Sequence, residues 1–365
     1  MTEKEKYIEF ILKKATRVKS GDNLVIWCSK AQADFAEEVL NYALNTGARN
    51  AEIFYTDGLT LSNIPSVKIS CWKQNLYKLL WLYSDNCTLL PPIRWTTVNV
   101  ATENWAKQVF PNIENTNAAV EKLWESIFKA CRTDNDNPVE EWNIHINNLI
   151  DKADKLNSFN FSQLQIKSKS GTDLKLNLIR NHKWINCTTT NYSGETVITN
   201  IPTEEVFTAP DTNSLNGVVY ASKPIFYKNE LIENFILYFE NGRIVDFYAE
   251  KNMHLLEQLI NSCAGADHIG EIAIVPHSCP LSLLGIFWYD TSFDENTGCH
   301  LALGYTYPQT IKNYTQCSEE ELSDIGYNKC DIHEDFVIGT EDMEIIGITE
   351  NSEKITILLN GEWNI

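Results

Sequence analysis

The stretch Phe235-Ile-Leu-Tyr-Phe-Glu-Asn-Gly-Arg-Ile-Val-Asp-Phe247 predicts two β-strands joined by a tight turn at Asn241-Gly242. Asn-Gly favours the left-handed backbone that a two-residue hairpin turn requires. Two further hairpins are expected from similar patterns, over residues 162–179 and around Asn351-Ser352. The chain from about residue 160 onward is therefore predicted to be β-rich, with only short helices between its strands.

The N-terminal part has a different pattern. Asn23–Cys28 and Ala51–Tyr55 are short apolar segments typical of strands, and residues 31–45 between them have helical spacing. This order predicts a β-α-β unit with a parallel strand pair. Two further helices are expected over residues 115–132 and from Pro138 to about Leu156. The predicted fold class is mixed α/β and α+β: an α/β domain over 1–158, followed by a β-rich domain over 159–365.

Composition limits the possible partners. The formal charge is −19, from 30 basic and 49 acidic residues. Nucleic acids and anionic lipids bind through lysine and arginine, so neither is an expected partner. No apolar segment of membrane-spanning length and no secretory signal follows Met1. None of the ten cysteines forms a C-x-x-C pair, which favours a cytoplasmic protein with reduced thiols.

Possible metal ligands occur next to strand-like segments in the last 165 residues. Glutamate, aspartate and histidine are the residue types that hold hard or borderline divalent ions. In the H-x-D pattern of His333 and Asp335, an extended backbone would direct both side chains to one face. Each residue taken singly also fits a solvated charge or a buried, hydrogen-bonded histidine, and spacing alone does not bring the segments together. The candidates are Glu205, Glu271, His300, His333 and Asp335.

Two other chemical interpretations are weaker. Cys299 precedes His300, yet a buried structural thiol is the commoner role of such a cysteine. The turn after Cys28 reads Ser-Lys-Ala-Gln and has no glycine that would let a pyrophosphate approach the backbone, which argues against a dinucleotide site. His145 lies beside an apolar helical stripe and is expected to be structural.

Several longer stretches closely resemble the thermophilic-aminopeptidase family, the M29 metallopeptidases. The resemblance extends from about residue 95 to the C-terminus and is looser over the first 55 residues. The stretches that carry it are Asn200-Ile-Pro-Thr-Glu-Glu-Val-Phe-Thr-Ala-Pro-Asp211, Phe239-Glu-Asn-Gly-Arg243, Gly270-Glu-Ile-Ala-Ile-Val-Pro-His277, Phe293-Asp-Glu-Asn-Thr-Gly-Cys-His-Leu-Ala-Leu-Gly304, Ala119–Phe128 and Asn360-Gly-Glu-Trp363.

The resemblance implies a metal-dependent aminopeptidase that acts on peptides with a free N-terminus. It also implies a homodimer and two divalent ions per chain, with Zn, Co, Mn and Mg all compatible with the ligand types. Tyr307 matches a family tyrosine at the metals and is a candidate to donate a hydrogen bond to the developing oxyanion. The ligands that the resemblance implies are Glu205, Glu271, His300, Tyr307, His333 and Asp335.

The general base is less well defined. Glu204 is the candidate because it adjoins Glu205, although an extended backbone would direct the two side chains to opposite faces. The sequence departs from the family pattern over 57–92, which is shorter than in the family, and over 186–191 and 278–285. Two alternatives stay open: a metal-binding relative with little or no turnover, and a two-metal amidohydrolase acting on another amide.

Overall fold

The structure is a computed structural model that describes residues 1–56, 66–72, 93–190 and 194–365. The chain forms two compact units, one made of residues 1–145 and 187–203 and the other of 146–186 and 204–365. Helix α5 (Pro138–Phe159) contributes residues to both units and ends where the sequence predicts a domain boundary, at 158–159. The division into domains at that boundary stays a prediction. The segment shortened relative to the family pattern, 57–92, lies outside the described residues except for 66–72.

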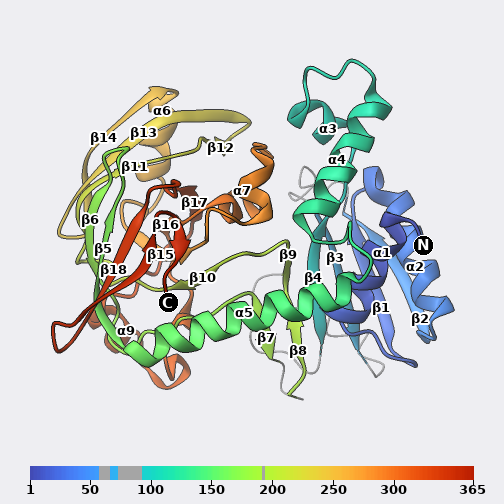
Figure 1. Cartoon of the computed structure of the whole chain (residues 1–365), viewed down its shortest axis with the longest axis horizontal. Helices are drawn as coiled ribbons and strands as arrows, with labels where there is room; N and C mark the ends of the chain where they lie inside the picture. Colours follow the sequence, from blue (N-terminus) through green and yellow to red (C-terminus); the bar gives the residue numbers. More distant parts are fainter. Residues whose placement is uncertain (57–65, 73–92, 191–193) are drawn as a thin grey trace. The chain divides into compact units, whose positions relative to one another are not determined.

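The first unit contains a five-stranded sheet with helices packed beside it (Figure 1). β1 pairs with β2 in parallel, and α2 connects them, which confirms the predicted β-α-β unit. The apolar side chains of β1 other than Trp27 are buried, and α2 buries Phe35, Ala36, Val39 and Ala43 at helical spacing. The strands, in sheet order, are β2 (Asn50–Tyr55), β1 (Asn23–Cys28), β3 (Ser66–Trp72), β4 (Arg94–Asn99) and β9 (Asn200–Ile201).

The helices of the first unit begin at polar capping residues. Thr2 and Glu5 form a capping box at the start of α1, and the Asn115 side chain caps α4. His145 is buried, and its Nε2 lies 2.7 Å from the Thr203 carbonyl oxygen, in agreement with a structural role. Besides α5, the helices are α1 (Glu3–Phe10), α2 (Ala33–Asn45), α3 (Glu103–Val109) and α4 (Thr116–Ala130); the short β7 (Thr188–Thr190) pairs with β8 (Thr196–Ile198).

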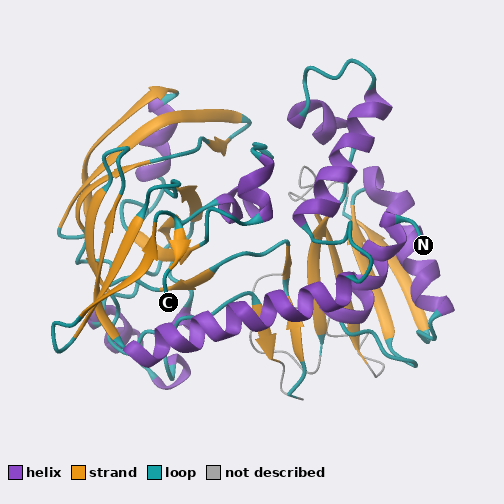
Figure 2. Cartoon of the chain, in the orientation of Figure 1, coloured by secondary structure: helices purple, strands orange, loops and turns teal. Residues whose placement is uncertain are grey.

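The second unit is rich in strands, as predicted (Figure 2). Its larger sheet contains the hairpin of β13 and β14, which pairs Glu240 with Arg243 and leaves Asn241-Gly242 as the turn. Both turn residues have positive φ, and a Cβ on Gly242 would lie 1.9 Å from the Thr212 carbonyl oxygen, so glycine is required there. The strands are β5 (Phe161–Lys167), β6 (Asp173–Asn177), β11 (Asn216–Tyr220), β12 (Ile225–Tyr227), β13 (Glu230–Glu240), β14 (Arg243–Lys251), β18 (Glu344–Thr349), β19 (Lys354–Leu359) and β20 (Glu362–Trp363).

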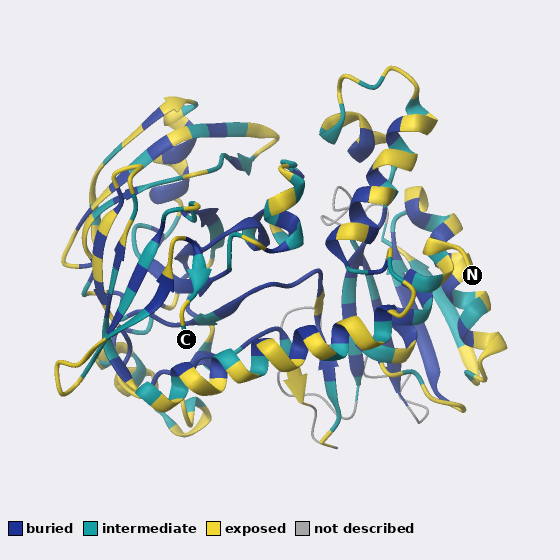
Figure 3. Cartoon of the chain, in the orientation of Figure 1, coloured by how far each residue is buried: buried dark blue, intermediate teal, exposed yellow. Residues whose placement is uncertain are grey.

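A four-stranded sheet lies in the interior of the second unit. Every residue of β15 and β16 is buried (Figure 3). Short helices follow or precede its strands: α6 (Met253–Ile260), α7 (Pro280–Leu284), α8 (Thr291–Asp294) and α9 (Glu319–Asp324). The strands, in sheet order, are β10 (Val206–Thr208), β15 (Ile269–Ile274), β16 (His300–Gly304) and β17 (His333–Val337).

These elements confirm the predicted mixed fold class. Within the residues that the structure describes, every helix is too short or too polar to cross a lipid bilayer.

Candidate metal centre

The four-stranded sheet brings all five predicted acidic and histidine ligands together. Glu205 directly precedes β10, Glu271 lies in β15, His300 begins β16, and β17 carries both His333 and Asp335. The strands are antiparallel, so directly paired residues present their side chains on the same face. The sequence motifs that spacing could not connect therefore meet on one face of one sheet.

Each ligand candidate in the paired strands lies opposite a small residue. Ala302 of β16 is paired on one side with Glu271 and on the other with Asp335. Ala273 is paired with His300, and Gly304 with His333. The methyl groups and the glycine leave room on this face for the longer side chains to converge.

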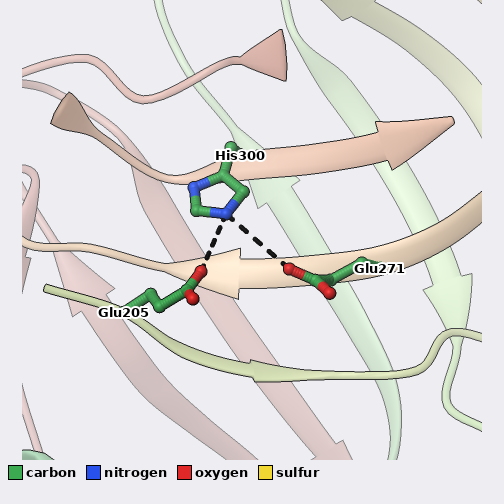
Figure 4. A group of neighbouring side chains, drawn as sticks. All are labelled: Glu205, Glu271 and His300. Carbon is green, nitrogen blue, oxygen red and sulfur yellow. Dashed lines mark ion pairs between the residues drawn. The ribbon is translucent and has the colours of Figure 1, made fainter. Parts of the chain in front are cut away.

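The ligand atoms form two groups that share Glu271. In the first group, His300 Nε2 lies 3.0 Å from Glu205 Oε2 and 3.7 Å from Glu271 Oε1 (Figure 4). In the second, His333 Nε2 lies 3.7 Å from Glu271 Oε2 and 3.5 Å from Asp335 Oδ1. Within each group, the ligand atoms all lie within 4.8 Å of one another. Such spacing suits coordination of one ion by each group.

Several of these atoms are buried without a hydrogen-bond partner among the described residues: Glu271 Oε2, His300 Nε2 and Asp335 Oδ1. Buried polar atoms are normally satisfied, and three such atoms facing one another fit a bound cation. The second ring nitrogen of each histidine contacts the backbone: His300 Nδ1 lies 3.1 Å from the Gly298 oxygen, and His333 Nδ1 lies 2.8 Å from the Tyr305 oxygen. Donation from Nδ1 leaves the Nε2 lone pair available to a metal, so the residues fit divalent ions.

The protonation of the metal-free site reflects its excess of carboxylates. Burial raises the pKa of Glu271 to about 7. Burial lowers the pKa of His333, but the carboxylates of Asp335 and Glu271 outweigh this effect and raise it to about 9. Glu205 and Glu271 similarly hold the pKa of His300 well above its usual range, against the opposing effect of burial. Protons thus partly compensate the negative charge, and a bound metal would displace them.

Glu295 belongs to this cluster, and sequence reasoning missed it. It lies on a 3-10 turn five residues before His300, and its side chain shares a hydrogen bond with Asp335. Burial, together with Asp335 and Glu205, raises the pKa of Glu295 well above its usual range. A protonated Glu295 can donate to Asp335. The residue stands within the family-like Phe293–His300 segment, but no spacing rule distinguished it from an ordinary surface glutamate.

Tyr307 lies at the edge of the cluster, 39% exposed, with its ring centroid 4.5 Å from that of His333. Burial and the nearby carboxylates of Glu271 and Asp335 raise the pKa of its hydroxyl, which therefore stays protonated. Glu204 is buried beside Glu205, and its backbone N–H donates to Asn296 Oδ1 at 2.7 Å. Among the described residues, neither group of converging ligand atoms includes Glu204.

Among the described residues, Cys299 belongs to neither group of converging ligand atoms. It is buried, its Sγ lies 3.3 Å from the Val275 carbonyl oxygen, and burial raises its pKa to about 11. A thiol held protonated in this way is a poor nucleophile.

Comparisons with known proteins identify the family of this chain. The sequence profile of the family described as Thermophilic metalloprotease (M29) matches residues 58–363. Aminopeptidase AmpS of Bacillus subtilis is 39% identical over 337 residues, which are 92% of this chain and 80% of that protein. Aminopeptidase PepS of Streptococcus thermophilus is 41% identical over 273 residues, 75% of this chain and 66% of that protein.

The fold is also shared. The solved structure of wild-type AmpT from Thermus thermophilus superposes with a TM-score of 0.84 at 27% identity, covering 100% of this chain and 99% of that one. The family match and these relatives support a metallo-aminopeptidase hydrolase, the enzyme class expected from the motifs, and imply a divalent metal cofactor. The chain belongs to the M29 family of thermophilic metalloproteases.

Proposed function

We propose that this chain is a two-metal aminopeptidase that releases N-terminal amino acids from peptides. The observation that carries the proposal is the position of Glu271, whose Oε1 and Oε2 each lie 3.7 Å from a different histidine. A carboxylate shared in this way is suited to bridge two ions. Glu205 and His300 would complete one ion's ligands, and His333 and Asp335 the other's, with Tyr307 at the edge.

Two divalent ions, when bound, supply a water of lowered pKa and positive charge beside the scissile carbonyl. Zn, Co, Mn and Mg all accept carboxylate and imidazole ligands. The chain's contribution is to orient these ligands on a buried sheet and to exclude bulk water from them; a bound metal would displace their protons. Tyr307, kept protonated, is positioned to donate its hydroxyl hydrogen to the oxyanion that forms when the carbonyl is attacked.

A carboxylate must take a proton from the attacking water and pass it to the leaving amine. Two residues compete for this role. Glu204 was the candidate from the sequence because it adjoins Glu205. Glu295 is the candidate from the structure because its side chain shares a hydrogen bond with Asp335 beside the converging ligand atoms.

The competition is decided by comparing Glu204→Gln with Glu295→Gln at full metal loading. Loss of a general base lowers kcat by about 10²–10⁴-fold, whereas a glutamate that only packs beside a ligand changes metal affinity more than kcat. Measured kcat and bound metal therefore separate the two roles. If both variants keep near wild-type kcat, neither glutamate is the base.

The proposed activity is tested by release of free amino acids from a panel of peptides, measured by mass spectrometry. The protein is stripped with a chelator and reloaded separately with Zn, Co, Mn or Mg. Activity should return with metal and be absent from Glu205→Gln, while the exposed Glu353→Gln serves as the matched control. Peptides with an acetylated N-terminus should resist cleavage.

Two other outcomes of this assay would contradict the proposed activity. Cleavage of acetylated peptides or other amides would indicate a different two-metal amidohydrolase. Two bound ions without any release would indicate a metal-binding relative that lacks turnover.

The proposed assembly is a homodimer, and light scattering of the eluting protein should give twice the chain mass of 41.7 kDa. A mass equal to one chain would refute the dimer without affecting the site.

A further inference from the structure

Two thiols lie in contact outside the metal centre. Cys263 Sγ and Cys330 Sγ are 3.2 Å apart, although the residues are separated by 67 positions in the sequence. Cys263 lies in the turn that follows α6 and leads toward β15, and Cys330 lies three residues before β17. Both are thiols in this structure. A disulfide has an S–S bond of about 2.05 Å, so a shift of about 1 Å would join them.

The two segments that carry these thiols are already held together. Asn328 Nδ2 donates to the Gly265 carbonyl oxygen at 2.8 Å and to the Gly304 carbonyl oxygen at 2.7 Å. The Gly304 N–H donates to the His268 oxygen at 2.8 Å. Because these hydrogen bonds position both segments against the end of β16, bond formation between the sulfurs does not require the strands to move.

The two sulfurs differ in their surroundings in the way that a reactive pair requires. Cys263 is half-buried, whereas Cys330 is buried with 9% exposed. Burial raises the pKa of Cys330 to about 11. The pKa of Cys263 is lowered, since the hydrogen bonds from Cys330 and the Asp331 backbone outweigh burial. Cys263 is therefore the thiol that reagents reach first, and Cys330 the one that resolves the intermediate.

We propose that Cys263 and Cys330 form a redox modification site, in which oxidation by a peroxide or a small-molecule disulfide joins them into an intramolecular disulfide. With hydrogen peroxide, the Cys263 thiolate attacks one oxygen and the O–O bond breaks. Hydroxide is the leaving group, and Cys263 becomes a sulfenic acid. The Cys330 sulfur then displaces the sulfenic oxygen as water and forms the S–S bond. With a small-molecule disulfide, two exchange steps release two thiols. In both cases the two cysteines lose two electrons and two protons.

The position of the bond indicates its effect. It links the segment before β15 to the segment before β17. Strand β15 carries Glu271, and strand β17 carries His333 and Asp335. The cross-link closes a long stretch of chain, which restricts the unfolded state and raises the melting temperature by several degrees, about 5 °C. In a metal-loaded protein, it also slows the separation of the two ligand strands and hence the loss of metal to a chelator. This last effect rests on the proposed function; the bond itself does not.

The test treats the reduced full-length protein with hydrogen peroxide or oxidised glutathione and counts its thiols. From the ten cysteines of the chain, two should be lost, and peptide mass spectrometry should find Cys263 linked to Cys330 with a loss of two hydrogens. Cys263→Ser should keep its Cys330 thiol free and show no rise in melting temperature. Cys317→Ser, which removes another half-buried cysteine, is the matched control and should behave as wild type.

Two results would overturn the inference. One is a stable glutathione adduct on Cys263 with Cys330 still reduced, because the resolving step would then be absent. The other is a Cys263 and a Cys330 that both stay reduced at oxidant concentrations that modify Cys317. Since the linked peptide is detected without any activity assay, failure of the aminopeptidase proposal leaves this test intact. A linked protein that loses metal as fast as the reduced one would refute only the effect on the metal centre.

Discussion

Buried charge is treated differently in the two units of this protein. In the first unit, the buried Arg94 guanidinium forms an ion pair with buried Asp22. The Nε atom of Arg94 lies 3.7 Å from Glu195 Oε2. Lys19 in turn pairs with Glu195, so two positive groups face two negative ones. In the second unit, four carboxyl groups surround only two imidazoles: Glu205, Glu271, Glu295 and Asp335 around His300 and His333.

The difference separates a structural charge cluster from the candidate functional one. In a balanced buried pair, each charge compensates the other. A surplus of buried carboxylates is stable only if protons or a cation supply positive charge. The raised pKa values of Glu271 and His333 show protons in that role in the metal-free chain. Charge balance, rather than the number of buried charges, therefore identifies the candidate site.

The largest effect is expected from Glu271→Gln, which removes the residue shared by both ligand groups. Activity should fall by more than about 100-fold, since even indirect partners of a metal contribute 10–100-fold. Metal analysis should show weakened binding at both positions. Asp335→Asn should weaken only one of them, and Glu353→Gln neither. Retention of two tightly bound ions by Glu271→Gln would contradict a bridging role.

The balanced cluster should respond in stability rather than in chemistry. Arg94→Met leaves Asp22 buried without its partner, which destabilises the protein by about 3–5 kcal/mol. Urea unfolding of the metal-loaded protein measures this change. Metal stoichiometry and kcat at a temperature where the variant is folded should match wild type. A variant that folds normally but has lost metal would show that the two clusters are not independent.

The smallest effect is a dependence of stability on pH, to which the unbalanced cluster contributes. In the metal-free protein, the pKa of Glu271 is raised from 4.5 to about 7 and that of His333 from 6.5 to about 9. The folded state then binds more protons than the unfolded state between about pH 4.5 and 9. Its free energy of unfolding should therefore fall as pH rises through that range, and thermal unfolding measures this.

Metal affinity should change in the opposite direction. A metal must displace the proton of His333, so the affinity for the ion that His333 and Asp335 would hold should rise about tenfold per pH unit between pH 7 and 9. Calorimetric titration at several pH values measures the slope. Arg94→Met should keep it, and His333→Gln should reduce it. A flat affinity over this range would indicate that His333 is already neutral.

Much of the architecture followed from local sequence signals. Asn241-Gly242 marked a hairpin because few other residues accept its turn geometry, and the alternation of apolar and helical segments before residue 60 marked the β-α-β unit. The strand β3 fell in a region without a clear pattern and was not predicted. Glu295 was missed because a glutamate on a short turn carries no periodic signal, and only its contact with Asp335 distinguishes it.

The sequence by itself determined the secondary structure of the long periodic segments, the mixed fold class and, through its motifs, the ligand residue types. It did so because backbone preferences and family motifs are local properties of the chain. Only the tertiary structure decided which side chains meet. The pairing of Ala302 with both Glu271 and Asp335, and the contact between Cys263 and Cys330, depend on strand register and loop position. Those depend on long-range packing, which no local pattern specifies.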